Sequence, residues 1–88
     1  MPVLSMFYGI IVQMYSELGG KHHMPHIHVK YSDYKAVVTF NGELLEEDFP
    51  KNKLKLLDAW IELHRDELTA NWELLLAGDE YFRIEPLK

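Results

Sequence analysis

The architecture follows from residues 26–40, which have the sequence HIHVKYSDYKAVVTF. Apolar and polar side chains alternate in the first half, so His26 and His28 face one way while the apolar residues face the other. Ser32-Asp33 is typical of a two-residue turn, which predicts an antiparallel hairpin. The facing pairs on one side are all apolar, which supports the register: Tyr31 with Tyr34, Val29 with Ala36, and Ile27 with Val38.

Further strands are predicted on both sides of this hairpin. Residues 9–15 are apolar on both faces and predict a preceding strand, followed by a Gly- and His-containing loop over residues 16–25. Downstream, Asn41-Gly42 is typical of a type I′ turn into a fourth strand that ends near Glu46. This turn would place Phe40 opposite Glu43 and Val38 opposite Leu45.

The span between Pro50 and Gly78 contains no helix breaker, which predicts one long helix or two joined near Arg65-Asp66. A single helix would be roughly 40 Å long against roughly 23 Å for a seven-residue strand, so it must overhang the sheet, bend or break. Residues 81–84 then predict a last short strand. The helical stripe expected to cover the sheet comprises Leu54, Leu57, Ile61, Leu68, Trp72 and Leu75.

These elements predict a single α+β domain over residues 1–88: an antiparallel meander of about four strands, packed by one long or bent helix, plus a short C-terminal strand. The chain has no cysteine, which excludes disulfides and thiolate metal sites. Its net charge of -5 argues against nucleic acid as a partner. No apolar run approaches the ~20 residues needed to span a bilayer, so we expect a cytoplasmic protein without a membrane anchor.

Four of the five histidines fall between residues 22 and 28. His26 and His28, with His22 or His23 from the loop as a third ligand, are candidates for a divalent metal site of the zinc, nickel or iron type, and His22 is the preferred third ligand. Histidines could instead serve as acid and base in RNA cleavage or hydrolysis, because imidazole titrates near neutral pH. The simplest alternative is a polar sheet face that meets solvent or a partner.

The helical span adds polar candidates. His64 and Asn71 lie seven residues apart beside Trp60, so each is expected to be partly buried. They either bond backbone carbonyls of the sheet or of the Gly19-Gly20 loop, or line a pocket. A second ridge lies on the opposite side of the helix. It comprises Leu56, Leu63 and Leu74 with Ala59 and Ala70, and represents either scattered exposed leucines or a surface covered by the chain ends, a second copy or a partner.

Several segments together resemble the family of small prokaryotic proteins catalogued as domain of unknown function 4160. They are Phe7-Tyr8-Gly9-Ile10, Met14-Tyr15, Pro25-His26-Ile27-His28-Val29, Tyr31, Trp60, His64, Glu67-Leu68, Asn71-Trp72 and Ile84-Glu85-Pro86-Leu87. The resemblance implies no established activity. It does imply a gene commonly found beside that of another small uncharacterised protein, an arrangement similar to toxin–antitoxin pairs.

We therefore expect a partner-binding component of a two-gene, toxin–antitoxin-like module, which binds the neighbouring gene product, itself, or both. The expected binding residues are His22, His26, His28, Trp60, His64, Asn71 and Trp72. The alternative is a histidine-dependent ribonuclease or a metal-assisted hydrolase, with His26, His28 and His64 as catalytic candidates.

Overall fold

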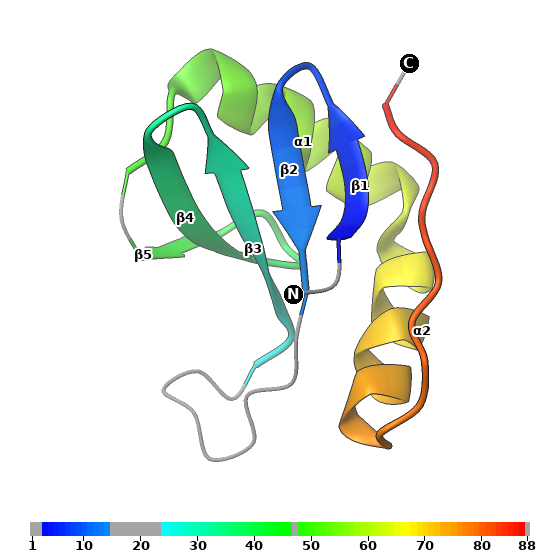
Figure 1. The fold of residues 1–88 in the computed structure, drawn as a ribbon. Coiled ribbons are helices and arrows are strands. Elements are labelled where there is room, and N and C mark those ends of the chain that lie inside the picture. The colour runs from blue at the N-terminus through cyan, green and yellow to red at the C-terminus, as the bar shows by residue number, and fades with distance from the viewer. Residues whose placement is uncertain (1–2, 15–23, 47, 88) are drawn as a thin grey trace.

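The computed structural model describes residues 3–14, 24–46 and 48–87, which form one antiparallel sheet and two helices (Figure 1). The sheet is a meander in which each strand pairs with the next one along the chain, in the order β1-β2-β3-β4-β5. Its strands are β1 (Val3–Phe7), β2 (Ile10–Gln13), β3 (His26–Tyr31), β4 (Tyr34–Thr39) and β5 (Leu44–Glu46). The α+β class predicted from the sequence is confirmed, and the meander contains one strand more than expected.

The β3–β4 hairpin has the predicted register. Tyr31 pairs with Tyr34, and the apolar pairs that follow it are those expected from the alternating pattern. Ser32 has a φ of 52°, so the two-residue turn places a non-glycine residue in the left-handed region. The buried face of this hairpin belongs to the core, whereas Lys35 on the opposite face is exposed.

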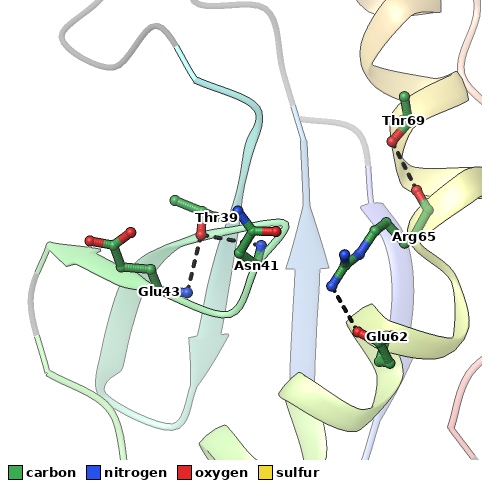
Figure 2. A network of polar contacts seen from close by, with 6 residues as sticks. All are labelled: Thr39, Asn41, Glu43, Glu62, Arg65 and Thr69. Atoms are coloured by element: carbon green, nitrogen blue, oxygen red, sulfur yellow. Dashed lines mark hydrogen bonds and ion pairs between the residues drawn. The ribbon is translucent and has the colours of Figure 1, made fainter.

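The predicted β4–β5 register is wrong. Val38 pairs with Leu44, not Leu45, because the connection is a three-residue loop rather than a two-residue type I′ turn. Only Gly42 has positive φ there, at 85°, and Thr39 N–H donates to the carbonyl of Glu43. The Thr39 hydroxyl oxygen also accepts bonds from the N–H groups of Asn41 and Glu43, as Figure 2 shows. This loop leaves Phe40 buried beside Trp72, their ring centroids 6.2 Å apart.

β1 is an additional strand that the sequence interpretation did not include. It joins β2 through the turn Tyr8-Gly9, in which both residues have positive φ, 49° and 81°. This is the type I′ geometry that suits the twist of two antiparallel strands. β2 corresponds to the strand expected over residues 9–15, although Tyr15 and most of the expected loop, residues 15–23, lie outside the described residues.

The long helical span is broken into α1 (Lys51–Leu63) and α2 (Arg65–Leu76), one residue before the expected junction. His64 separates them with φ -119° and ψ 24°, while its N–H still bonds the carbonyls of Trp60 and Ile61. Figure 1 shows α1 lying across the sheet and α2 turning away at the β1 side. The break solves the length problem, because each half can follow a different direction.

The core lies between the sheet and the helices. Every residue of the predicted helical stripe is either part of the buried core or packed against it. Trp60 is fully buried, and its ring lies 5.3 Å from that of Phe7 on β1. Among the described residues, no helix is long and apolar enough to cross a membrane.

The expected C-terminal strand is not present. Residues 79–87, here called the strap, are extended but irregular, and run alongside α2 towards β1 (Figure 1). The strap donates one backbone hydrogen bond to β1, from Ile84 N–H to the carbonyl of Leu4 at 2.9 Å. At its start, Asp79 N–H donates to the backbone carbonyl of Leu74, and further along the strap bonds the side chains of Trp60 and Asn71. These bonds go to the helices, so a ladder with β1 does not form.

Candidate functional site

His26 and His28 lie on β3 and contact each other, with ring centroids 5.2 Å apart. His26 is only 1% exposed, because Trp72 of α2 packs against it edge to face, 5.2 Å away. Nδ1 of His26 donates to the carbonyl of Met24 at 2.8 Å. The prediction of a polar sheet face that meets solvent is therefore wrong for His26, because α2 covers the first residue of β3.

His64 belongs to a different cluster. Its Nδ1 lies 2.6 Å from Oε1 of Glu67, one turn further along α2, and its ring packs 5.5 Å from that of Trp60. The side chain is 18% exposed. A carboxylate on Nδ1 fixes the orientation of the ring and the tautomer of the neutral imidazole.

Trp60 and Asn71 hold the strap. Asn71 is fully buried and bonds both backbone groups of Phe82, while Nε1 of Trp60 donates to the carbonyl of Glu85 at 2.8 Å. Asn71 is hydrogen-bonded within the protein, which was one of the two alternatives, but the predicted partner in the sheet is wrong, because both described bonds go to the strap. The Gly19-Gly20 loop lies outside the described residues. These anchors connect α1, α2 and β1 through one short segment.

The predicted binding residues thus form separate clusters. The structure brings His26, His28 and Trp72 together, joins Trp60 to His64, and commits Asn71 to the strap. His22 and His23 lie outside the described residues. Within the part of the chain that the structure describes, no group of three or more His, Asp or Glu side chains could hold a metal ion.

The predicted leucine ridge is uneven. Leu56 packs against the core and Leu74 is half-buried, but Leu63, at the end of α1, is 69% exposed. Two surface polar contacts lie near this end of α1: Arg65 pairs with Glu62 at 2.7 Å, and the Thr69 hydroxyl donates to the carbonyl of Arg65 (Figure 2). The ridge therefore does not form one continuous apolar surface.

An apolar surface that sequence reasoning missed lies at the β1–β2 hairpin. Met6 is 57% exposed and Tyr8 is 54% exposed, and Met6 pairs across the strands with the half-buried Ile11. We call Met6, Tyr8 and Ile11 the edge patch. They line a hollow of about 370 Å³ around the turn. The signal in the sequence was the stretch of residues 3–7, apolar except for Ser5, directly before Tyr8-Gly9.

Asp58 of α1 is an electrostatic feature that the sequence did not indicate. Burial raises the pKa of its carboxyl group above the ordinary value. Its Oδ1 is enclosed and has no hydrogen-bond partner in the described structure. The atom lies under the β4–β5 loop, where a Cβ added to Gly42 would meet it at 3.0 Å.

Comparison with known proteins identifies one family. The family model described as "Domain of unknown function (DUF4160)" matches residues 9–73, from the β1–β2 turn into α2. No curated protein and no solved structure matches the chain. The match includes β2 to β5, both histidines of β3 and Asn71, and leaves out β1 and the strap. Because it spans well over half of the 88 residues, this chain belongs to the DUF4160 family of unknown function.

Proposed function

We propose that this protein acts by binding another protein, as one component of a two-gene, toxin–antitoxin-like module. The resemblance described above implies a neighbouring small protein as its partner. The observation that carries the proposal is Tyr8, which combines a φ of 49° with 54% exposure. The first position of a type I′ turn favours asparagine, aspartate or glycine, so turn geometry does not account for a tyrosine there.

Strain at an exposed aromatic residue is a reason to look for function. Tyrosine is enriched among the residues that dominate protein–protein binding energy. Met6 and Ile11 extend the apolar surface of Tyr8 across two strands. The edge patch therefore supplies an anchor of the kind that a protein partner would cover.

The polar candidate residues give less support to a catalytic function, because they do not line one shared pocket. Asn71 and Trp60 use their hydrogen-bonding groups on the strap, and Nδ1 of His26 is used on the backbone. Such contacts stabilise the fold and position its segments. A binding role needs only an exposed surface, which the edge patch provides.

The test is co-expression with the product of the neighbouring gene, followed by purification of the complex and measurement of its mass in solution. Tyr8→Asn is the decisive variant, because asparagine tolerates positive φ and should keep or raise the melting temperature. We expect binding to fall by at least about tenfold, as for a hot-spot residue. Leu76→Asn is the control, since Leu76 is 43% exposed at the far end of α2. Wild-type protein that forms no complex with that product would refute the proposal.

A second candidate is a histidine-dependent ribonuclease or metal-assisted hydrolase, and the contact between His64 and Glu67 is what favours it. An imidazole oriented by a carboxylate can act as a base through its other nitrogen. His64→Ala and His28→Ala should then abolish turnover or toxicity while the melting temperature changes by only a few degrees. A collapse of stability in both variants would instead assign these histidines to the fold.

A further inference from the structure

The outer edge of β1 presents backbone groups that no strand uses. Within the described residues, β2 is its one strand neighbour. Phe7 and Ile10 flank the two-residue turn, so they form the hydrogen-bonded pair that begins the ladder. The next pair, Met6 with Ile11, is then a non-hydrogen-bonded pair. The N–H and carbonyl of Met6 therefore point away from β2.

The strap covers only part of this edge. Its hydrogen bond to β1 falls at Leu4, the other residue whose backbone faces outward. Between the strap and the strand lies a groove of about 450 Å³, lined by residues 4–6 of β1 and residues 83–86 of the strap. This volume lies within the range of about 300–1,000 Å³ that is typical of binding sites. We call it the strap groove.

Ser5 gives an independent indication. It lines the strap groove, is only 4% exposed, and its hydroxyl has no hydrogen-bond partner in the described structure. A hydroxyl that is removed from water without a partner carries the full desolvation penalty. Because the oxygen is enclosed, an incoming backbone N–H or carbonyl could supply the missing bond after the Ser5 side chain changes rotamer towards the strap groove.

We propose that the partner contributes an extended segment, which lies in the strap groove and adds a strand to β1 through the backbone of Met6. This inference rests on the proposed function and names the mode of binding. Strand addition is a general way to recognise a peptide, because main-chain bonds provide affinity and alternate side chains provide specificity. Met6 also belongs to the edge patch, so the strap groove and the edge patch adjoin at this residue.

The segment is assigned to a different protein rather than to a second copy. Two β1 strands that paired symmetrically around Met6 would be antiparallel, so Leu4 of each copy would lie opposite Tyr8 of the other. The strap, whose Ile84 is already bonded to Leu4, occupies the place that the second copy would need there. Each copy also carries a net charge of -5, so two copies repel each other while a basic partner is attracted. The expected segment is extended, apolar at alternate positions and derived from a basic protein.

The probes are the complete product of the neighbouring gene and overlapping synthetic peptides that cover its sequence. Hydrogen exchange on the wild-type protein measures the amide of Met6 directly, and we expect protection to rise by at least about tenfold in the complex. Met6→Pro removes that N–H, and proline is tolerated at an edge position whose N–H faces outward. We expect at least about a tenfold loss of affinity and a nearly unchanged melting temperature.

Ser5→Ala keeps the inference testable if Met6→Pro does not fold. It removes the unpaired hydroxyl, so the free protein should be as stable or more stable, while affinity for the partner should fall about three- to tenfold. Thr69→Ala is the matched control, since that hydroxyl is exposed on α2 and bonded to Arg65.

The outcomes separate the two proposals. If the complete partner binds but the amide of Met6 stays unprotected and Ser5→Ala binds normally, strand addition is overturned and partner binding stands. If the complete partner does not bind, both proposals are overturned. Concentration-dependent dimers of the protein alone, in which the amide of Met6 becomes protected, would assign the strap groove to a second copy and overturn the present inference.

Discussion

The side chain of Asn71 holds the backbone of Phe82 through two hydrogen bonds, each 2.9 Å long. Nδ2 donates to the Phe82 carbonyl, and the Phe82 N–H donates to Oδ1. The amide thus offers the donor and acceptor that a neighbouring strand would otherwise supply. This explains how the strap remains extended while forming no ladder, and why a buried asparagine is needed on α2.

Asn71→Asp should therefore destabilise the protein strongly at neutral pH. A carboxylate can accept from Phe82 N–H but faces the Phe82 carbonyl without a proton to donate, which costs at least about 2 kcal/mol in a buried site. The loss should shrink as the pH falls, because a protonated carboxyl group can donate to the carbonyl. Urea unfolding at several pH values measures this. The control is Asn52→Asp, exposed near the start of α1, which should change stability little.

Ile84→Ala should destabilise the fold by about 2–4 kcal/mol, because Ile84 is 3% exposed and belongs to the core cluster. Phe82→Ala should cost less than about 1 kcal/mol. Phe82 is held by its backbone, and its side chain is 41% exposed. Thermal unfolding of both variants provides the comparison. Equal losses would show that the strap is not fastened in the way described.

The sequence could predict those parts of the fold that depend on residues close together in the chain. The β3–β4 register followed from alternating side chains and a two-residue turn. Comparing lengths showed only that the helix must overhang the sheet, bend or break, and the structure shows the break. The sequence interpretation missed strand β1 because its register with β2 shifts between Val3 and Ser5. Leu4 and Ser5 are consequently both buried, and the alternation that marks a strand is lost.

The candidate residues were less predictable because their partners are distant in the chain. The bond between Trp60 and Glu85 joins residues 25 positions apart, and nothing in the helical pattern indicates a backbone partner. The exposed Tyr8 became informative only after the turn geometry was known. Sequence could identify His64 and Asn71 as partly buried polar residues, but not which groups they bond.

Gly42→Ala should be more destabilising than Gly78→Ala. Both glycines have positive φ, 85° and 79°, so both substitutions strain the backbone by about 1 kcal/mol or more. Only Gly42 has a close neighbour, since the added Cβ would lie 3.0 Å from Oδ1 of Asp58. Combining Gly42→Ala with Asp58→Ala should remove the difference between the two glycine positions. An unchanged difference in calorimetry would mean that this contact is not the cause.

Asp58→Asn should increase stability at neutral pH and alter its pH dependence. Burial raises the folded-state pKa of Asp58 above its unfolded value of 3.8, so the folded protein binds more protons in the window just above that value. Wild-type stability therefore falls, relative to the variant, as the pH rises from 3.8 through the raised pKa. Unfolding free energies of both proteins across this range measure the effect. Parallel curves would contradict it.

The histidine tautomers provide the last prediction. The Met24 carbonyl and the ionised Glu67 carboxylate can only accept hydrogen bonds, so the neutral rings of His26 and His64 should both carry their proton on Nδ1. Nitrogen–proton NMR of the imidazole rings measures this, and a proton on Nε2 would contradict the assigned contacts. Glu67→Leu should allow His64 to exchange between tautomers while His26 stays unchanged, which makes His26 the internal control. The same spectra during a zinc titration would show whether His26 and His28 bind metal together.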